Sequence, residues 1–239
     1  MSAEKPGTAP ARPARCSPLA AWYQSVGRGT RLVEDMELPA ALATPRAQNA
    51  ALRLRDLSWR RRVGCKGPAA GGWLAAAGLQ VPEAPNSANV DAAGIFVARL
   101  AASEFLIEAM GGDATRVEAM RGKLEAGKHP PGVYPVARQD LVVDVSGPAT
   151  DALLRQTCNV DFEPLLRRDA ASGGPVILTS MVGVGVVAWP RRGVGGPAVT
   201  LWTDPSFAYY FWTTLLAVGR DLEGGVAVAE PLASGHTGT

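Results

Sequence analysis

The chain has 239 residues, of which 47% are apolar and 19% charged, a composition typical of a folded core and not of a disordered protein. Its net charge of +2 gives no broad field for nucleic acid or acidic membranes. No run of about 18 apolar residues occurs, so no transmembrane helix is expected, and no signal-peptide core is recognised near Met1. The three cysteines form no C-x-x-C pair, which favours reduced thiols in a cytoplasmic protein over a disulfide scaffold or a zinc site.

The N-terminal region shows little regular pattern. Residues 1–18 are rich in Pro, Ala and Arg, which is typical of a flexible arm. Residues 19–50 mix Ala-rich pieces with prolines, and only "LAAWYQSV" indicates a short helix. We therefore expect residues 1–50 to form a partly irregular arm that packs on a partner, and residues 230–239 to form a tail.

Regular organisation begins at residue 51. "ALRLRDLSWRRRVG" alternates apolar and charged residues and predicts one half-exposed strand. Gly67-Pro68 follows, and then a helix, "AAGGWLAAAG", closed by Gly78. Two β runs, Ile95–Leu100 and Phe105–Ala109, precede an amphipathic helix in "DATRVEAMRGKLEAG".

The same order returns in the second half. Leu141–Val145 is its strongest strand, and Gly147-Pro148 lies 80 residues after Gly67-Pro68. The helix "ATDALLRQTC", two β runs in "PVILTSM" and "GVGVVAWP", and the strand "AVTLWTD" follow. The last helix, in "PSFAYYFWTTLLAVGRDLEGG", is predicted to bury one stripe made of Phe207, Tyr210, Phe211 and Leu215.

Each copy therefore reads β-α-β-β-α. This order predicts an α+β fold with antiparallel sheets and helices on one face, of ferredoxin-like type. Residues 51–229 are expected to form a single globular body from repeat 1 (51–130) and repeat 2 (131–229). A period of about 80 residues is too long for a solenoid.

Patterns that would indicate catalysis or metal binding are few. His129 lies in a proline-rich loop and His236 in the tail, and neither has a second histidine at metal-ligand spacing. A Ser-His-Asp system would need His129, which proline locks in its loop, so this interpretation is disfavoured. "GVGVVAW" matches only part of G-x-G-x-x-G, and its Gly183 and Gly185 are expected where another backbone approaches a strand closely.

The sequence favours structural roles over chemical ones for the charged residues that are candidates for a site. Asp140 follows Arg138, and a pair at the sheet end is favoured over general acid–base chemistry. Lys66 stands at the first Gly-Pro corner and could meet an anion, but Ser146 replaces it at the second corner. The other carboxylates considered are Asp144, Asp161 and Asp204. The basic clusters expected as solvated loops or salt-bridging rims are Arg60-Arg61-Arg62, Arg167-Arg168 and Arg191-Arg192.

The cysteines and tryptophans are also predicted to have packing roles and not catalytic ones. Cys65 and Cys158, near the two corners, are predicted to be buried packing residues and not nucleophiles, while Cys16 stands apart. Trp73 and Trp212 are expected in the core, and the core is also favoured for Trp189 and Trp202, with a role as interface anchors as the alternative. No residue is predicted to be catalytic or to bind a metal, and cofactor-binding residues are left unassigned.

Five stretches in order resemble the gamma subunit of heterotetrameric sarcosine oxidase and the wider folate-binding fold of glycine-cleavage T-protein relatives. They are "GCKGPAAGGWLAAAGL", "VYPVARQD", "SGPATDALLRQTCNVDF", "VILTSMVGVGVVAW" and "LWTDPSFAYYFWTTLL". The resemblance covers about residues 57–225, and the 50 residues at the N-terminus are longer than it leads us to expect.

The resemblance implies a cytoplasmic, non-catalytic gamma subunit of an oxidoreductase complex in one-carbon metabolism. Such complexes oxidatively demethylate sarcosine or related N-methyl amines with FAD, FMN, NAD, tetrahydrofolate and zinc. The implied partners are an alpha subunit that handles NAD and folate, a beta subunit with covalent flavin, and a delta subunit with zinc. This chain would bind no cofactor alone. The alternative is a free-standing tetrahydrofolate-dependent aminomethyltransferase-like or folate-binding protein.

Overall fold

Three β-sheets organise the computed structural model, which describes residues 15–43, 50–111, 114–168, 173–193 and 195–229. The first-repeat sheet contains, in spatial order, β11 (Gly173–Pro175), β6 (Ser87–Val90), β7 (Ile95–Ala101), β8 (Glu104–Ala109), β5 (Arg62–Lys66) and β9 (Tyr134–Val136). The second-repeat sheet contains β12 (Ile177–Met181), β13 (Val184–Gly193), β14 (Gly196–Thr203), β10 (Leu141–Ser146), β4 (Leu52–Asp56) and β15 (Val226–Ala229). The N-terminal sheet contains β1 (Arg15–Cys16), β3 (Met36–Leu42) and β2 (Gly27–Val33).

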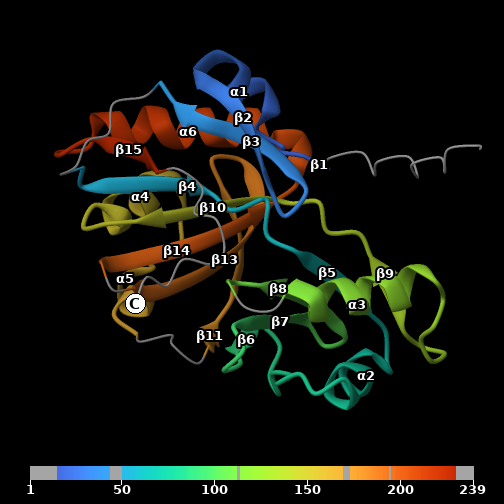
Figure 1. Ribbon diagram of the computed structural model, residues 1–239. Helices are drawn as coiled ribbons and strands as arrows, with labels where there is room; N and C mark the ends of the chain where they lie inside the picture. The colour runs from blue at the N-terminus through green and yellow to red at the C-terminus, as the bar shows by residue number, and fades with distance from the viewer. Residues whose placement is uncertain (1–14, 44–49, 112–113, 169–172, 194, 230–239) are drawn as a thin grey trace, which may run out of the picture.

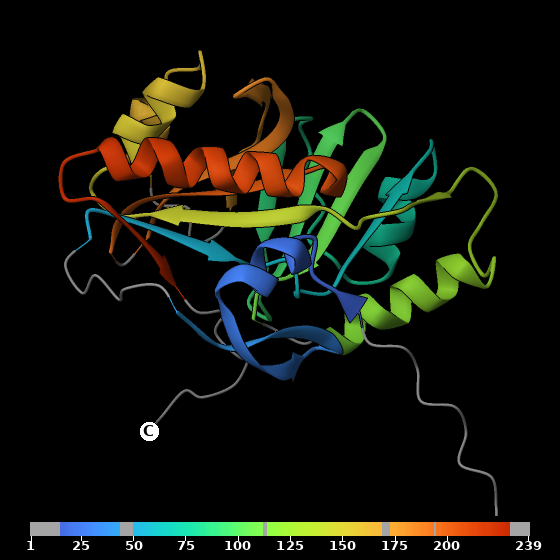
Figure 2. The same cartoon turned by 90° about the horizontal axis from the view of Figure 1, so that it is seen from above.

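Helices cover the outer faces of the two larger sheets (Figure 1). The helical elements are α1 (Ala20–Val26), α2 (Ala70–Ala76), α3 (Ala114–Glu125), α4 (Thr150–Thr157), α5 (Glu163–Leu166), η1 (Pro205–Phe207) and α6 (Ala208–Asp221). Val63, Phe105 and Ile107 of the first-repeat sheet share a core with residues of α2 and α3. In the view from above, α6 runs in nearly the same direction as β10 of the second-repeat sheet (Figure 2).

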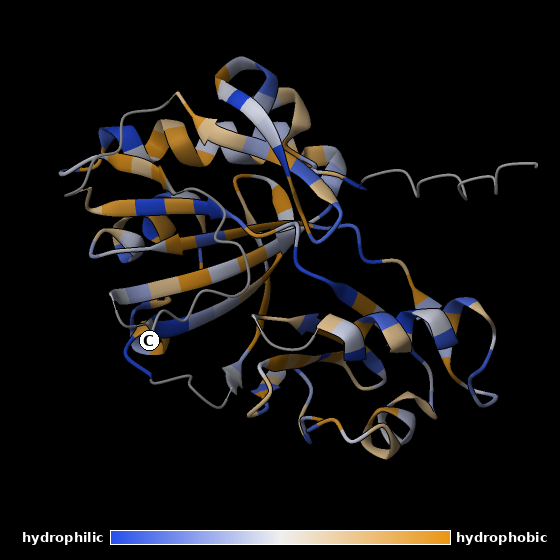
Figure 3. Cartoon of the chain, viewed as in Figure 1, coloured by the Kyte–Doolittle hydropathy of each residue, from blue (hydrophilic) through white to orange (hydrophobic). Residues whose placement is uncertain are grey.

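The inner faces of the two larger sheets pack against each other. The ring of Phe96, on β7, stacks on the ring of Trp202, on β14, with centroids 5.2 Å apart. Phe96 and Leu106 belong to the same core cluster as the buried residues of β10 and α6. Hydrophobic residues accordingly dominate β7 and much of α6 (Figure 3). The layers are therefore helices, sheet, sheet and helices, which confirms the predicted α+β class.

The two repeats exchange strands: the first repeat gives β4 to the second-repeat sheet, and the second repeat gives β9 and β11 to the first-repeat sheet. β4 comes from the first repeat but pairs with β10, placing Leu54 opposite Val145. β9 comes from the second repeat but pairs with β5, placing Pro135 opposite Cys65. The ranges 51–130 and 131–229 thus describe the repeated order of elements, while each sheet takes strands from both ranges.

The Gly-Pro corners accommodate the exchanged strands. At the first corner the amide of Ala69 donates to the carbonyl of Gly132, before β9, at 3.1 Å. At the second the amide of Ala149 donates to the carbonyl of Ala51, before β4, at 3.0 Å. Gly67 and Gly147 have φ angles of +118° and +122°. A Cβ would lie 2.2 Å from the Gly132 oxygen at Gly67, and 2.4 Å from the Ala51 oxygen at Gly147. Glycine is required because the neighbouring strand enters at this point.

Three predictions of local structure are wrong. The single strand predicted from residue 51 to 64 is two strands, β4 and β5, which lie in different sheets. The sheets are mixed and not purely antiparallel, because β15 runs parallel to β4 and β1 parallel to β3. In the predicted buried stripe of the last helix, Phe207 is 48% exposed and Tyr210 52% exposed, since both lie at the first turns, where the chain leaves the sheet.

The expected irregular segment 19–50 is also more ordered than predicted. The short helix predicted in "LAAWYQSV" is present as α1, but β2 and β3 then form an antiparallel hairpin. Its turn residues, Glu34 and Asp35, have φ angles of 49° and 59°, values usually left to glycine or asparagine. The hairpin therefore lacks the usual turn sequence. Packing of this segment on a partner remains a prediction, and residues 1–14 and 230–239 lie outside the described part of the chain.

A buried carboxylate holds the N-terminal segment on the body. Asp56, at the end of β4, accepts hydrogen bonds from the Ser17 hydroxyl at 2.8 Å and the Tyr23 hydroxyl at 2.9 Å. It also accepts from the Ser58 amide at 2.8 Å. Burial, together with the charge of Asp56, raises the pKa of Tyr23 well above its ordinary value, so this hydroxyl stays protonated as a donor.

Replacing Asp56 by alanine is expected to loosen this segment. Two buried hydroxyls and one amide lose a charged acceptor, which should cost roughly 3 kcal/mol. Trypsin should then cut faster at Arg28, an exposed residue of β2. Asp161→Ala is the matched control, because that side chain is 65% exposed. Equal cleavage rates in Asp56→Ala and wild type would contradict the anchoring role.

Candidate functional site

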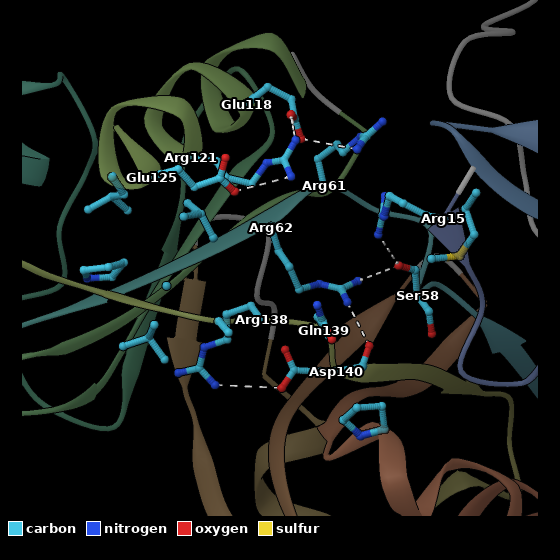
Figure 4. A pocket seen from close by; sticks show the side chains of 18 of the residues that line it. Arg15, Ser58, Arg61, Arg62, Glu118, Arg121, Glu125, Arg138, Gln139 and Asp140 are labelled. Atoms are coloured by element: carbon cyan, nitrogen blue, oxygen red, sulfur yellow. Dashed lines mark hydrogen bonds and ion pairs between the residues drawn. The ribbon is translucent and has the colours of Figure 1, made fainter. Parts of the chain in front are cut away.

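A cavity of about 760 Å³ lies where β1, α3 and the chain between β9 and β10 meet (Figure 4). Its charged lining residues are Arg15, Arg61, Arg62, Glu118, Arg121, Glu125, Arg138 and Asp140. The volume is within the range that holds small organic ligands. Of the sequence candidates, the cavity gathers Asp140, Arg138 and two arginines of the 60–62 cluster.

Arg62 forms the back wall of the cavity. Its Nη1 donates to the carbonyl of Asp140 at 2.9 Å, and its Nη2 donates to the carbonyls of Leu57 and Ser58 at 3.1 and 3.3 Å. Its Nε donates to Glu108 at 3.0 Å. Because every nitrogen of the guanidinium is engaged, Arg62 ties β5 to the segment that enters β10.

Glu108 connects the two larger sheets behind this wall. The carboxylate is fully buried on β8 and lies opposite Arg62 in the β5–β8 register. It also accepts from Arg60 Nη1 at 3.3 Å and from the indole nitrogen of Trp202, on β14, at 2.8 Å. Sequence reasoning missed Glu108; the available signal was a lone acid within the apolar run "FLIEAM".

Asp140 carries an unmatched acceptor. Its Oδ1 lies 3.8 Å from Arg138 Nη1, a long contact. Its Oδ2 is buried and accepts no hydrogen bond from the described residues. Burial raises the pKa of the Asp140 carboxyl above its ordinary 3.8, opposed by Arg62 and Arg138. The predicted pair with Arg138 therefore exists in a weak form.

The raised pKa of Asp140 predicts how the contribution of this residue to stability depends on pH. Since the folded-state pKa is the higher one, the stability contributed by Asp140 is fully present below 3.8 and is lost as pH rises through the folded pKa. Asp140→Asn should therefore raise the free energy of unfolding near neutral pH by about 1 kcal/mol or less, with the gain vanishing in acid. Urea unfolding across pH measures this, with Asp161→Asn as the exposed control. A variant less stable than wild type at neutral pH would contradict the prediction.

Arg138 crosses the cavity floor over Gly64. A Cβ on Gly64 would lie 2.9 Å from Arg138 Nε, so the glycine leaves room for this side chain. Arg138 Nη2 donates to Glu104 at 2.8 Å, whereas its Nε is buried without an acceptor among the described residues. Arg138 Nε and Asp140 Oδ2 are thus both buried in the protein beneath the cavity surface, and neither has a hydrogen-bond partner among the described residues.

Arg15 forms the opposite rim. Its guanidinium donates to the carbonyl oxygens of Trp59, Ser58 and Glu34, at 3.0, 3.2 and 3.4 Å. Burial and the nearby charges of Arg61 and Arg62 lower its pKa to about 10. Arg15 remains cationic at neutral pH, and an approaching anion would relieve that repulsion.

The remaining sequence candidates do not join the cavity. Asp144 is buried and pairs with Arg191 between the sheets, and Arg191 also lies over the Trp189 ring at 4.9 Å. Asp161 is exposed near Arg155, and Asp204 caps η1 by accepting from the Ser206 amide at 2.8 Å. Lys66 is exposed at its corner.

Several predicted packing roles are confirmed. Cys65 and Cys158 are buried free thiols, and burial raises the pKa of Cys65 to about 12, which opposes a nucleophilic role. Trp189 and Trp202 are 3% and 1% exposed, so their alternative role as interface anchors is wrong.

Two of the other sequence interpretations need revision. Gly183 and Gly185 would have nothing within 4 Å of an added Cβ, so the predicted close backbone approach is wrong; Gly183 instead supplies the φ of +82° in the β12–β13 turn. Arg61 and Arg62 form ion pairs as predicted but are buried and not solvated. Arg62 pairs with the buried Glu108, and Arg61 pairs with Asp35, in the turn of the N-terminal hairpin.

The described residues include no cluster of side chains of the kind that histidine catalysis or metal binding needs. His129 is half-buried, and its ring lies 3.4 Å from the carbonyl of Pro130, while His236 lies outside the described residues. Within the described ranges, no three His, Cys, Asp or Glu side chains are placed to hold a metal ion. In the same ranges no helix has the length and apolarity needed to span a membrane.

Several solved structures share this fold, among them one chain of an oxidase and one aminomethyltransferase. A chain of heterotetrameric sarcosine oxidase from Corynebacterium sp. U-96, determined in complex with pyrrole 2-carboxylate, is 23% identical, with a TM-score of 0.59. The match covers 84% of the present chain and 93% of that chain. The glycine cleavage system aminomethyltransferase T from Bartonella henselae is 15% identical over 90% of the present chain, with a TM-score of 0.63. The present chain spans only 59% of that protein.

These similarities establish the fold that the resemblance in the sequence led us to expect. At identities of 23% and 15% they establish the fold alone. No known protein family matches the sequence, and no curated protein is similar to it.

Proposed function

We propose that the chain is a non-catalytic gamma-type subunit of a heterotetrameric flavoenzyme that oxidatively demethylates sarcosine or a related N-methyl amine. The observation that carries the proposal is the difference in coverage. The chain matches 93% of a chain from the heterotetrameric sarcosine oxidase but only 59% of the aminomethyltransferase. The fold of the chain therefore corresponds to nearly all of one chain of that assembly, and to little more than half of the aminomethyltransferase.

The interior of the chain supports a structural role. The contact between the two larger sheets is filled by the stacked Phe96 and Trp202 rings. Beside them the Glu108 carboxylate binds three donors, from Arg60, Arg62 and Trp202. These groups satisfy one another, as groups that stabilise a fold do.

We further propose that the cofactors of such an assembly, FAD, FMN, NAD, tetrahydrofolate and zinc, are held by its alpha, beta and delta subunits. For zinc, the described residues do not fit, because they offer no cluster of His, Cys or carboxylate ligands. Exposed aromatic side chains suit subunit contacts, and Phe207, Tyr209 and Tyr210 supply three at the start of α6.

Purification through a tag on this chain, from the cells that make it naturally, tests the proposal. The preparation should show flavin absorbance and should reduce its flavin when sarcosine or another N-methyl amine is added. A matched preparation tagged on an unrelated protein is the control. A preparation that contains this chain alone and lacks flavin would overturn the proposal.

The alternative is a free-standing folate-binding or aminomethyltransferase-like protein, which the similarity to the aminomethyltransferase favours. Titration of the purified chain with tetrahydrofolate, followed by tryptophan fluorescence, separates the two. The buried Trp189 and Trp202 lie between the sheets and would report binding there. A saturable change would favour the alternative; a flat titration up to millimolar ligand supports the subunit.

A further inference from the structure

The outward face of α6 carries no charge. Between Asp204, which precedes η1, and Arg220, near the end of α6, the sequence has no Asp, Glu, Lys or Arg. The helix nevertheless lies at the surface: Tyr209 and Tyr210 are 56% and 52% exposed, and in the view from above no described element lies over it (Figure 2). A surface helix normally turns charged residues to the solvent, so this face is atypical.

The corresponding helix of the first repeat has the usual composition of a solvent-facing helix. α3 ends the first repeat as α6 ends the second, and each covers the outer face of its own sheet (Figure 1). Five of the 12 residues of α3 are charged: Arg116, Glu118, Arg121, Lys123 and Glu125. Two helices in matching places thus differ in the charge of their outward sides. Since the cores of protein interfaces are depleted of charged residues, the difference marks α6 as the helix that a partner covers.

The exposed and half-buried residues of α6 form two adjacent uncharged stripes. Every fourth position contributes to the same stripe, so one contains Tyr209, Thr213 and Ala217 and the other Tyr210, Thr214 and Val218. The Thr213 hydroxyl donates to the carbonyls of Tyr209 and Tyr210 in its own helix, at 2.8 and 3.2 Å. The polar group of Thr213 is therefore already bonded within the helix, which leaves the face suited to apolar contacts.

Three aromatic side chains at the start of this face are suited to anchor a partner. The Tyr210 hydroxyl donates to the carbonyl of Val182, in the β12–β13 turn, at 3.0 Å, which holds the ring in place. A side chain that is already held loses less conformational entropy on binding. Phe207 and Tyr209, beside it in the sequence, are 48% and 56% exposed. Aromatic residues of this kind often supply most of the binding energy of an interface.

The size of the face limits what can cover it. A helix of 14 residues is about 21 Å long and about 10 Å wide, so its outward side offers about 200 Å². Two such convex faces, one from each of two copies of the chain, would bury about 400 Å² together, well below the roughly 1,200 Å² of a stable interface. A groove that encloses the flanks as well buries more. On one flank, α1 packs beside α6 through the Trp22–Trp212 contact, and its exposed residues, Ala21, Gln24 and Ser25, are also uncharged.

We propose that α6 docks in an uncharged groove of a larger, different subunit of the proposed assembly, with Phe207, Tyr209 and Tyr210 as anchors. This inference rests on the proposed function, which supplies the partner. Helices bind grooves through side chains three and four positions apart, which is the spacing of the two stripes. The groove should lack charged side chains, because a charge buried against this face would find no opposite charge on it.

Single charges placed on α6 test the inference in the complex purified through a tag on this chain. Ala217→Lys and Tyr209→Lys should each raise about tenfold the concentration at which dilution releases the flavin-carrying subunit, because docking would bury the new cation. Lysine is a good helix former, so α6 should tolerate both changes. Gly122→Lys is the matched control: it adds the same charge to α3, where an added Cβ has nothing within 4 Å, and should dissociate as wild type does.

The outcomes separate this inference from the proposed function. If wild type holds a flavin-carrying subunit and both α6 variants hold it equally well, or if Gly122→Lys weakens the complex as much as they do, the docking face is wrong and the proposed function stands. If wild type holds no such subunit, both are wrong. Hydroxyl-radical footprinting of the wild-type complex needs no variant to fold. The Tyr209 and Tyr210 rings should be labelled several-fold less in the complex than in the dissociated chain, and equal labelling would overturn the inference.

Discussion

Gly147→Ala is expected to lower the free energy of unfolding by roughly 3–5 kcal/mol, through backbone strain and steric overlap together. The residue has a φ of +122°, and its new Cβ would lie 2.4 Å from the carbonyl oxygen of Ala51. That oxygen belongs to backbone entering β4, and it accepts the hydrogen bond of Ala149, so it has little freedom to move. Gly67→Ala should behave alike, since its Cβ would lie 2.2 Å from the Gly132 oxygen.

Substitutions at two other glycines separate the cost of backbone strain from the cost of steric overlap. Gly183 has a φ of +82° with nothing within 4 Å of a Cβ, so Gly183→Ala reports strain alone, about 1–2 kcal/mol. Gly72 lies within α2 with open space around it, so Gly72→Ala should be neutral or stabilising by about 1 kcal/mol. Urea unfolding of the four variants measures the series. If Gly147→Ala lowers the free energy of unfolding no more than Gly183→Ala does, the strand that enters at the second corner does not constrain Gly147.

Glu108→Ala is the second substitution expected to have a large effect. It would leave the buried side chain of Arg62 and the guanidinium of Arg60 without their shared carboxylate, and the Trp202 indole nitrogen without an acceptor. Removing one partner from a buried ion pair typically costs about 3–5 kcal/mol. Because Trp202 lies on the other sheet, the loss should also weaken the packing between sheets, seen as a change in tryptophan fluorescence.

Matched variants make this prediction specific. Glu108→Gln keeps an acceptor for Trp202 and should cost less than Glu108→Ala. Glu125→Ala removes a carboxylate that is 61% exposed and 3.7 Å from Arg121, and should change stability by about 0.5 kcal/mol or less. Urea unfolding again provides the measurement. A Glu108→Ala variant as stable as Glu125→Ala would show that the buried network does not hold the sheets.

The sequence predicts the local elements of the two repeats well, because their signals are local. The strand at Leu141–Val145 and the helices after both Gly-Pro corners follow from apolar spacing and from the backbone demands of Gly and Pro. The corners are architectural, as expected, and the structure supplies the reason: Ala51 and Gly132 carry the exchanged strands past them.

The exchange itself is not visible in the sequence. Pairing of β4 with β10 depends on where residues 57–61 lead the chain, and the alternation in "ALRLRDLSWRRRVG" is equally compatible with one strand. The N-terminal hairpin escaped prediction because Glu34 and Asp35 adopt positive φ without glycine.

The cavity was only partly predictable. Arg138 and Asp140 stand two residues apart and were recognised as a possible pair. Arg15 reaches the site from an N-terminal region that shows no regular pattern, and the Glu108–Trp202 contact joins residues 94 positions apart. Contacts of this kind depend on tertiary structure, which periodicity does not encode.

Native mass spectrometry of the complex purified through this chain tests the central claim most directly. The account predicts that the 24.9 kDa chain appears in a larger assembly, in equal copy number with a flavin-carrying subunit. Gentle dissociation should release this chain without flavin. A species at the mass of the chain alone, with no larger assembly, would contradict the account.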